Sequence, residues 1–338
     1  MSAQPAAPAF GSVFAASMAV MYFDGTSWTE PKVVPVEPIP MHPASHALHY
    51  GSTIFEGLKA HKGTDGIVRI FRPDRHAQRM TQSAARLYLA CPDAETIHGL
   101  MRDAVRANIT EVPSAPGSSL YLRPTLIGTT PNIGAAAAPS TEVMLYVLCS
   151  PVGDYFAGGL RPLKLLVETE QPRTTPLFGS VKCGANYVQA LPPTLRAKRE
   201  LGVDQVLFAP GGDVQETGAA NFLLIDDERV VTKALDTSFL HGVTRDSILR
   251  LAEDMGYVVE ERDLSVNEVV AWAARGGEAA LSGTAAVLSP VGTLLVGGEE
   301  VTVGDGGVGP NVLKLRDALT ALQRGEAEDT HGWLEAIG

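Results

Sequence analysis

The sequence predicts a protein of two domains with mixed α and β structure. At 338 residues, the chain is longer than a single hydrophobic core usually supports. Short runs with strand character alternate along it with amphipathic helical patterns. Residues 151–160 have the composition of a linker, with three glycines and flanking prolines. We therefore expect a smaller N-terminal domain over 1–150, a linker over 151–160 and a larger C-terminal domain over 161–338.

Composition excludes several classes of function. The hydrophobic share of 45% and charged share of 19% suit a soluble globular protein. A net charge of −11 without a basic run argues against nucleic acid as a partner. Three well-separated cysteines predict neither a disulfide framework nor a metal site, and fit a reducing cytoplasm. No apolar run is long enough to span a membrane, and the first residues lack the basic start of a signal peptide.

The N-terminal half predicts a loose arm followed by strands and two helices. Residues 1–12 form the arm, and two strands flank the Asp24-Gly25 turn. Residues 46–60 are dense in polar aromatic and small side chains, which is untypical of a core strand. Asp74 is the expected cap of the first helix. The expected strands are 18–23, 26–28, 68–71, 118–126 and 141–148, and the expected helices are 74–89 and 94–108.

The C-terminal half repeats the mixture of strands and helices. Pro192 and Pro193 are expected to distort or interrupt a helix over 186–200. Gly256 is the expected stop of a strongly amphipathic helix over 244–255. The other expected helices are 266–273 and 311–322. The expected strands are 163–167, 205–209, 213–215, 221–225, 229–232, 257–262 and 278–282.

Lys182 stands out because it lies between Val181 and Cys183 in a nearly charge-free stretch. A lysine with small and apolar neighbours is a candidate for a desolvated amine, and a neutral amine can form a Schiff base with a carbonyl compound. The ordinary alternative is a lysine near a helix start whose amine reaches solvent.

Two glycine-containing turns are candidate anion sites. In the turn at 240–246, Thr244 can cap the next helix, where free backbone N–H groups attract anions. In the turn at 281–286, small residues allow close approach and the hydroxyls of Ser282 and Thr284 can donate hydrogen bonds. Each turn could also be an ordinary capped turn. Neither matches a nucleotide-binding glycine motif.

Four further side chains are candidates. Glu216 lies between apolar strands, where a buried carboxylate needs a partner such as an arginine or a protonated ring nitrogen. The alternative is a turn glutamate that faces water. Arg123 interrupts an apolar strand, and such arginines usually have an anionic partner or face a cavity. Taken alone, Arg79 is typical of a solvated helix surface and Tyr187 of an ordinary helix tyrosine.

Together these residues describe a site for a phosphate-bearing aldehyde. It would contain a lysine for a Schiff base, a phenol, a carboxylate for a ring nitrogen and two anion-binding turns. These are the requirements of pyridoxal 5'-phosphate chemistry.

The same residues belong to eight short motifs that follow one another along the chain. In the type and order of these motifs, the whole chain resembles the branched-chain amino-acid aminotransferases, which are fold-type IV pyridoxal phosphate enzymes with the D-amino-acid aminotransferase-like fold. The motifs are His-Ala-Leu-His-Tyr-Gly and Phe-Glu-Gly (46–57), Phe-Arg-Pro-Asp with a later Arg (71–79), Tyr-Leu-Arg-Pro (121–124), Ser-Pro-Val-Gly-Asp-Tyr-Phe (150–156), Lys-Cys-Gly-Ala-Asn-Tyr (182–187), Gln-Glu-Thr-Gly with Asn (215–221), Gly-Val-Thr-Arg (242–245) and Ser-Gly-Thr-Ala-Ala (282–286).

The resemblance implies a role for each matching residue. Lys182 would hold the cofactor as a Schiff base and carry a proton, Tyr187 would bind the phenolic oxygen, and Glu216 would bind the pyridine nitrogen. Arg123 would receive the distal carboxylate of glutamate or 2-oxoglutarate. The remaining cofactor-binding positions are Arg79, Leu240, Gly242, Val243, Thr244, Gly283 and Thr284. The remaining substrate-binding positions are Tyr50, Phe55, Tyr121, Tyr155, Thr284 and Ala285.

The implied reaction moves an amino group between L-leucine, L-isoleucine or L-valine and 2-oxoglutarate, in a ping-pong cycle. The resemblance also implies a cytoplasmic homodimer, with active sites in the cleft between domains and a loop lent by the neighbour. Close alternatives are D-amino-acid, β-aromatic and (R)-amine aminotransferases and aminodeoxychorismate lyase. A metabolite-binding protein without a cofactor would have lost Lys182 or Glu216, and both are present.

Overall fold

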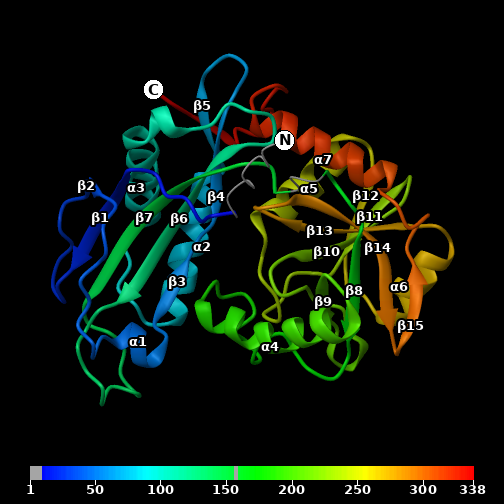
Figure 1. The fold of residues 1–338 in the computed structure, drawn as a ribbon, viewed down its shortest axis with the longest axis horizontal. Coiled ribbons are helices and arrows are strands. Elements are labelled where there is room, and N and C mark those ends of the chain that lie inside the picture. Colours follow the sequence, from blue (N-terminus) through cyan, green and yellow to red (C-terminus); the bar gives the residue numbers. More distant parts are fainter. Residues whose placement is uncertain (1–9, 156–158) are drawn as a thin grey trace, which may run out of the picture. The chain divides into compact units, whose positions relative to one another are not determined.

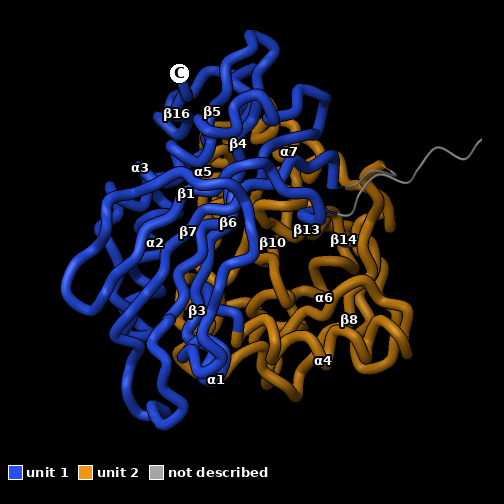
Figure 2. Tube along the Cα trace, turned by 60° about the vertical axis from the view of Figure 1, so that its left-hand side comes forward, with its two compact units in different colours: residues 1–157, 182–184, 322–338 blue, residues 158–181, 185–321 orange. Residues whose placement is uncertain are grey.

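The computed structural model describes residues 10–155 and 159–338, and it divides into two compact units (Figure 2). Unit 1 contains residues 10–155 together with 182–184 and 322–338, and unit 2 contains 159–181 and 185–321. The C-terminal segment belongs to unit 1 because strand β16 (Leu334–Ile337) pairs with β5 (Val68–Phe71). The domain boundaries and the linker over 151–160 stay predictions, and residues 156–158 lie outside the described residues.

Unit 1 contains one antiparallel sheet in the order β16-β5-β4-β6-β7-β1-β2, with β3 paired to β6 (Figure 1). The central pair is β6 with β7, whose ten residues each form a continuous register. The further strands are β1 (Ser17–Phe23), β2 (Lys32–Pro35), β3 (Thr53–Phe55), β4 (Leu58–Lys62), β6 (Ser119–Gly128) and β7 (Val143–Val152).

The helices of unit 1 are α1 (His46–Tyr50), α2 (Pro73–Arg86) and α3 (Ala94–Ala107). The predicted helices correspond to α2 and α3, which pack on each other, and α3 contacts β1 and β7. The predicted Asp74 cap is wrong, because the cap residue is Arg72, with φ of 50°. Pro73 takes the first helical position, where a missing N–H costs nothing, and this moves Asp74 into the first turn.

Unit 2 contains a mixed sheet in the order β12-β11-β10-β13-β14-β8-β9, with β15 paired to β14. The pairs β11–β12, β14–β8 and β8–β9 are parallel, and the others are antiparallel. The strands are β8 (Leu163–Glu168), β9 (Gln205–Phe208), β10 (Asn221–Ile225), β11 (Arg229–Thr232), β12 (Val258–Glu261), β13 (Glu278–Gly283), β14 (Val287–Val296) and β15 (Glu299–Thr302).

The helices of unit 2 are α4 (Gly184–Leu201), α5 (Val243–Asp254), α6 (Val266–Ala274) and α7 (Pro310–Gln323). Helix α4 continues through Pro192 and Pro193, so these prolines do not interrupt it, and the alternative expectation of a distorted helix stays a prediction. The carbonyls that lose their donors belong to Val188 and Gln189. Both residues are exposed, so water can satisfy these carbonyls.

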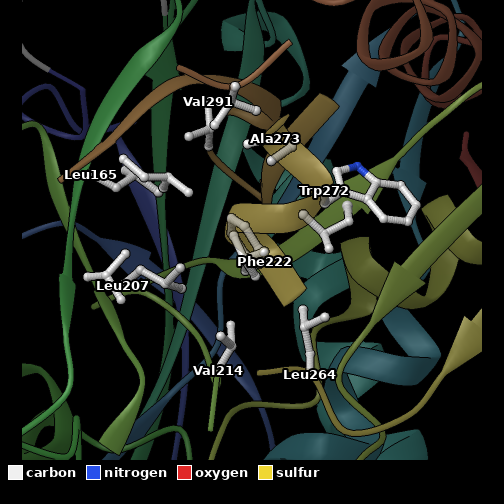
Figure 3. Packing of buried hydrophobic residues seen from close by; sticks show 14 of the residues in the cluster. Leu165, Leu207, Val214, Phe222, Leu264, Trp272, Ala273 and Val291 are labelled. Atoms are coloured by element: carbon white, nitrogen blue, oxygen red, sulfur yellow. The ribbon is translucent and has the colours of Figure 1, made fainter. Parts of the chain in front are cut away.

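The larger hydrophobic cluster of unit 2 joins the sheet to α6 (Figure 3), and a smaller one joins β9 to α4. Trp272 of α6 is fully buried beside Phe222, and its indole N–H donates to the Glu278 carbonyl at 3.1 Å. Leu165 and Leu207 extend the same cluster to strands β8 and β9.

Several strands differ from expectation. Residues 26–28 form only an isolated bridge from Phe23 to Trp28, and β1 pairs with β2 and β7 instead. Residues 213–215 are not a strand, and Asp213 only bridges Ser265. Strands β2, β3, β4, β14, β15 and β16 were not predicted. In β14 an internal proline and glycine obscure the strand pattern.

Candidate active site

Lys182 lies in an extended segment beside β3. Its carbonyl accepts a hydrogen bond from the Phe55 N–H at 3.0 Å, and its own N–H donates to the Ser83 hydroxyl of α2 at 3.1 Å. The amine nitrogen is 5.1 Å from the centre of the Phe55 ring. Because side chains alternate along an extended chain, Val181 and Cys183 are buried whereas Lys182 is half-buried. The side chain as a whole is therefore less enclosed than its neighbours predict.

Arg123 on β6 is held by two aromatic rings. The guanidinium carbon lies 4.6 Å from the centre of the Phe55 ring and 5.3 Å from that of Tyr121. Nη2 donates to the Tyr121 hydroxyl at 2.9 Å, while Nε is buried without a hydrogen-bond partner. Within the described residues no carboxylate pairs with Arg123. An arginine fixed in this way is suited to bind an incoming anion.

The other predicted aromatic residues fall into two places. Phe10 packs edge-on against Tyr121 and Tyr155, with ring centres 5.1 Å and 5.8 Å away. It belongs to the predicted arm, of which residues 1–9 lie outside the described residues. Tyr50 stands at the end of α1, where its hydroxyl donates to the Ile133 carbonyl and its ring lies 4.8 Å from that of His46.

Arg79 is buried, so the solvated surface position that its helix suggests is wrong. Its Nε donates to Oε1 of Glu56 at 2.8 Å, and Nη2 donates to Oε2 at 2.7 Å. His76 Nδ1 lies 2.6 Å from the same Oε2. Burial raises the pKa of Glu56, but the charge and hydrogen bonds of Arg79 and His76 outweigh burial and hold this pKa far below its ordinary value.

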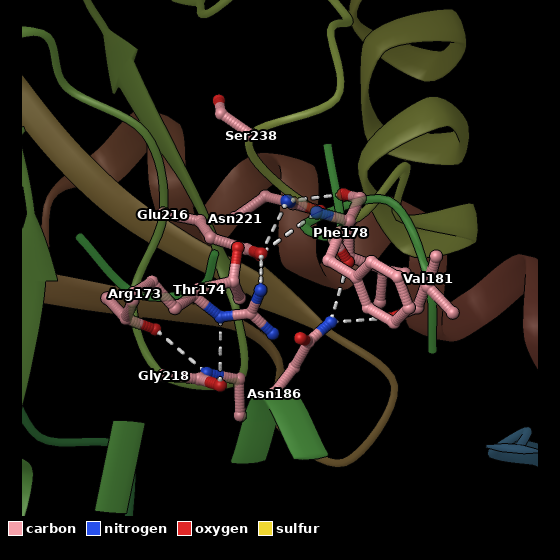
Figure 4. Close-up of polar contacts among 12 residues, drawn as sticks. Arg173, Thr174, Phe178, Val181, Asn186, Glu216, Gly218, Asn221 and Ser238 are labelled. Atoms are coloured by element: carbon pink, nitrogen blue, oxygen red, sulfur yellow. Dashed lines mark hydrogen bonds and ion pairs between the residues drawn. The ribbon is translucent and has the colours of Figure 1, made fainter. Parts of the chain in front are cut away.

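Glu216 is buried in unit 2 among three polar partners (Figure 4). Oε1 accepts from the Leu240 N–H at 2.8 Å, and Oε2 accepts from the Asn221 amide at 3.1 Å. Arg173, itself only 1% exposed, places Nη1 2.8 Å from Oε1. This contact is an ion pair whose angle is outside the hydrogen-bond range. Burial of Glu216 with an arginine partner is one of the two arrangements that its sequence setting predicts.

Asn221, the first residue of β10, joins Glu216 to both predicted anion turns. Its amide also donates to the Leu240 carbonyl at 2.8 Å, and its backbone is the cross-strand partner of Ser282. A Cβ atom on Gly242 would meet Asn221 Oδ1 at 2.1 Å, so a larger residue there would have to displace the buried Asn221 side chain.

The first anion turn leads directly into α5. The predicted Thr244 cap is wrong, because the cap residue is Gly242 and Thr244 is the second helical residue. No side chain caps α5, so the backbone N–H groups of Val243 and Thr244 stand at an uncapped N-terminus. Of the second predicted turn, Ser282 and Gly283 belong to β13, and the Ser282 hydroxyl is buried without a hydrogen-bond partner. A Cβ atom built on Gly283 would lie 3.6 Å from the Ala219 carbonyl oxygen and 3.7 Å from the Ala220 Cβ atom, so these backbones pass close to each other.

The predicted residues therefore form two groups, one in each unit. Unit 1 brings together Lys182, Phe55, Tyr121, Tyr155 and Arg123. Unit 2 brings together Tyr187, Glu216, Leu240, Gly242 and the turn after β13. Sequence reasoning assigned no role to Glu56, Arg173 or Asn221. All three are buried polar residues, and Glu56 and Asn221 stand inside motifs that were already singled out.

The described residues contain no group of three potential metal ligands close enough to hold an ion. A search of the same part of the chain for a helix long and apolar enough to cross a bilayer also finds none.

Comparisons with known proteins identify the family. The sequence profile of the family described as Amino-transferase class IV matches residues 53–294. Branched-chain-amino-acid aminotransferase 2 of Bacillus subtilis is 36% identical over 97% of this chain and 92% of its own length. Branched-chain-amino-acid aminotransferase of Mycobacterium tuberculosis is 38% identical over 98% of this chain and 92% of its own length.

Solved structures show the same relationship. A branched-chain amino acid aminotransferase from T.th., solved with pyridoxamine 5'-phosphate, superposes with a TM-score of 0.79 at 26% identity, over 96% of this chain and 100% of the other. The Escherichia coli enzyme gives 0.75 at 27% identity over 95% and 99% of the two chains. The chain belongs to the class IV amino-transferase family and has its fold.

The residues present fit pyridoxal 5'-phosphate. The uncapped start of α5, where Gly242 packs closely against the Asn221 side chain, suits a phosphate group. The Ser282 hydroxyl, near the end of β13, is a further buried hydrogen-bonding group without a partner. Glu216 offers a buried carboxylate to a ring nitrogen, and Lys182 an amine to an aldehyde. Arg79 engages Glu56 through Nε and Nη2, so a phosphate contact by Arg79 stays a prediction.

Proposed function

We propose that the protein is a branched-chain-amino-acid aminotransferase that uses pyridoxal 5'-phosphate. It transfers the amino group of L-leucine, L-isoleucine or L-valine to 2-oxoglutarate, which yields the branched 2-oxo acid and L-glutamate. The observation that carries this proposal is the position of Arg123 between the rings of Phe55 and Tyr121. It provides a guanidinium against an aromatic wall, and the relatives that carry this activity in their names span nearly the whole chain.

Each residue of the site then has a task. When bound, pyridoxal 5'-phosphate supplies an aldehyde for a lysine and a ring that withdraws electrons. Lys182 would hold the aldehyde carbon and would carry the proton that leaves the substrate α-carbon. Glu216 would hold the ring nitrogen and Tyr187 the phenolic oxygen. Val243, Thr244 and Thr284 would hold the phosphate, and Thr284 and Ala285 would also bind the substrate α-carboxylate.

The aromatic group explains how one pocket could accept two kinds of substrate. Rings contact a branched aliphatic side chain, whereas the guanidinium of Arg123 binds the distal carboxylate of 2-oxoglutarate. Apolar walls discriminate weakly between side chains that differ by one methylene group. We therefore expect leucine, isoleucine and valine all to react. Solved relatives bound to a phosphopyridoxyl-L-glutamate adduct and to 4-methylvaleric acid support both halves of this arrangement.

A product assay tests the proposal. Purified protein with pyridoxal 5'-phosphate is given 2-oxoglutarate and, in turn, leucine, isoleucine, valine, D-alanine and an (R)-amine. We expect glutamate from the three branched-chain substrates and a yellow protein whose absorbance band disappears with borohydride. Activity confined to D-alanine or the amine would favour another member of the family. A colourless protein that stays inactive with cofactor would refute the enzyme assignment.

Substitution of the lysine sharpens the test. Lys182→Ala removes the amine that binds the aldehyde, so it should bind cofactor without the borohydride-sensitive band and lose nearly all activity. Lys198→Ala, on the exposed face of α4, is the matched control and should retain both. Equal activity of the two variants would show that Lys182 is not the reactive lysine.

We further propose that the protein is a cytoplasmic homodimer. Each unit exposes apolar side chains that a second copy could cover. They are Leu48, Tyr50 and Ile133 in unit 1 and Val188, Leu191 and Leu195 of α4 in unit 2. All three cysteines are free thiols, as a reducing compartment would keep them. Sedimentation analysis should give twice the chain mass, and a monomer at micromolar concentration would contradict the dimer.

A further inference from the structure

Arg173 is the partner of Glu216 that no sequence motif indicates. It follows β8 in unit 2, in a segment whose composition is polar and turn-like. Its side chain is nevertheless among the largest fully buried ones of the described residues. Burying an arginine and a glutamate costs several kcal/mol per ion unless each compensates the other. The 2.8 Å separation between Nη1 and Glu216 Oε1 provides that compensation.

Arg173 also contacts a second residue of the candidate site. Its guanidinium carbon lies 5.9 Å from the centre of the Tyr187 ring on α4. Its Nε donates to the Gly218 carbonyl at 3.4 Å, in the turn between Glu216 and β10 (Figure 4). One planar cation thus connects the carboxylate, the turn that carries it and the tyrosine ring.

We propose that Arg173 is a positioning residue for the cofactor ring. It fixes the orientation and charge of Glu216, the proposed partner of the pyridine nitrogen, and sets the position of Tyr187, the proposed partner of the phenolic oxygen. The inference rests on the proposed function, because it acts through residues assigned to the cofactor. A lysine at this position would keep the charge but lose the fork that holds two partners at once.

A purely structural ion pair would have a different consequence. It would lower the unfolding temperature when broken, but folded protein would bind the cofactor normally. A positioning role instead changes how folded protein binds pyridoxal 5'-phosphate. The two roles are separated by the dissociation constant of the cofactor and by its visible absorption spectrum, both measured at a temperature where each variant is folded.

The experiment compares Arg173→Met, Arg173→Lys and a matched control, Arg229→Met. Arg229 also combines an ion pair with a ring contact, to Asp226 at 3.1 Å and to Trp272 at 5.3 Å. Arg229 lies at the end of the β10–β11 hairpin that carries the turn, whereas Asn221 lies at the other end. The five residues of β10 place these two ends of the hairpin about 15 Å apart. Apo-protein is titrated with pyridoxal 5'-phosphate, and the spectrum of each complex is recorded.

For Arg173→Met we expect about a tenfold or larger rise in the dissociation constant, equivalent to loss of one charge-assisted contact, and a shifted visible band. Arg173→Lys should recover only part of the affinity, because it keeps the charge but loses the planar fork, and Arg229→Met should match wild type in both readouts. Wild-type affinity and spectrum in Arg173→Met, or equal losses in Arg229→Met, would overturn the inference.

A second background guards against a variant that does not fold. Arg173→Met combined with Glu216→Gln leaves no buried charge unpaired. If Arg173 acts through Glu216, the double variant should bind the cofactor within about threefold of Glu216→Gln alone, because the two losses are not additive. Additive losses would contradict this route. If wild-type protein itself fails to bind the cofactor, the proposed function fails. If wild-type protein binds the cofactor and the Arg173 variants bind it equally well, the positioning role of Arg173 fails and the proposed function stands.

Discussion

The guanidinium of Arg79 holds both carboxylate oxygens of Glu56, with Nε at 2.8 Å from Oε1 and Nη2 at 2.7 Å from Oε2. Glu56 is completely buried and Arg79 nearly so. The pair links the segment between β3 and β4 to helix α2. A buried ion pair of this geometry makes each partner depend on the other.

The first prediction is that Glu56→Gln destabilises the protein by about 3–5 kcal/mol at pH 7, because it removes the buried negative charge that pairs with Nε and Nη2 of Arg79. Chemical denaturation measures the free energy of unfolding. Asp103→Asn, which breaks the exposed Arg106–Asp103 pair of 3.8 Å, is the control and should cost less than about 0.5 kcal/mol. Equal effects would show that burial of the Glu56 pair is unimportant.

The pH dependence of this pair has a definite sign. The pKa of Glu56 in the folded protein is lowered from 4.5, so the unfolded chain binds its proton first as the pH falls. The stabilisation by Glu56 is therefore complete above pH 4.5 and declines below it. The difference between wild type and Glu56→Gln should narrow from pH 5 to about pH 3.

His61 gives a second and separate prediction about acid. Burial, followed by the charges of Lys59 and Arg324, lowers its pKa from 6.5 to about 3. The unfolded chain therefore binds a proton between these values while the folded protein does not, and stability falls as the pH drops through this range. The slope is about 1.4 kcal/mol per pH unit at most. Unfolding curves at pH 4.5 to 7 measure it.

His61→Gln should flatten this slope, whereas His42→Gln, at an exposed position, should leave it unchanged. A slope that persists in His61→Gln would assign the acid sensitivity to another group, such as His76, whose pKa is also lowered by burial.

Side-chain chemistry made part of the candidate site predictable. Lys182 in an apolar stretch and Glu216 between apolar strands are unusual enough to be noticed in one dimension. The residues that pair with them are not recognisable from the sequence in the same way. Arg173 precedes Glu216 by more than forty residues, and only the fold brings their charges to 2.8 Å. The helix pattern taken alone suggests a surface position for Arg79, because it does not show that the chain brings Glu56 into hydrogen-bonding contact with this arginine.

The fold was predictable where periodicity was strong. Helices α3 and α5 follow their apolar spacing closely. Strand β14 was missed because Pro290 and Gly292 interrupt its pattern, although its neighbours β13 and β8 satisfy the backbone. The start of α2 was misplaced because Arg72 adopts a positive φ that its sequence does not signal. Local conflicts of this kind are resolved by tertiary contacts.

Gly57 provides a prediction about the aromatic group. A Cβ atom at this position would lie 2.1 Å from the Tyr121 hydroxyl and 3.0 Å from the adjacent ring carbon. Gly57→Ala should therefore displace Tyr121, which holds Arg123 through this hydroxyl and its ring face. We expect KM for 2-oxoglutarate to rise about tenfold, through loss of one oriented charged hydrogen bond. Steady-state kinetics measure it.

Gly99→Ala is the matched control, because a Cβ there meets nothing within 4 Å and the residue lies inside α3. It should leave the kinetics unchanged and stabilise the helix by up to about 1 kcal/mol. Adding Tyr121→Phe to Gly57→Ala removes the 2.1 Å contact and should recover stability. Wild-type kinetics in Gly57→Ala would mean that Tyr121 does not orient Arg123.

The final prediction separates the two substrates at Arg123. The guanidinium already has aromatic faces on two sides and one neutral hydrogen bond, but no carboxylate partner within the described residues. Arg123→Gln should therefore weaken the reaction with 2-oxoglutarate about 10- to 100-fold, the value of a hydrogen-bonded charge pair. The half-reaction with leucine needs only apolar contact and should change less than about threefold. Single-turnover absorbance with each substrate measures the rates of both half-reactions.

Arg123→Lys should give a rate with 2-oxoglutarate between those of wild type and Arg123→Gln, because it keeps the charge but loses the planar fork. Equal losses with leucine and 2-oxoglutarate would show that Arg123 supports the shape of the pocket and does not recognise the distal carboxylate.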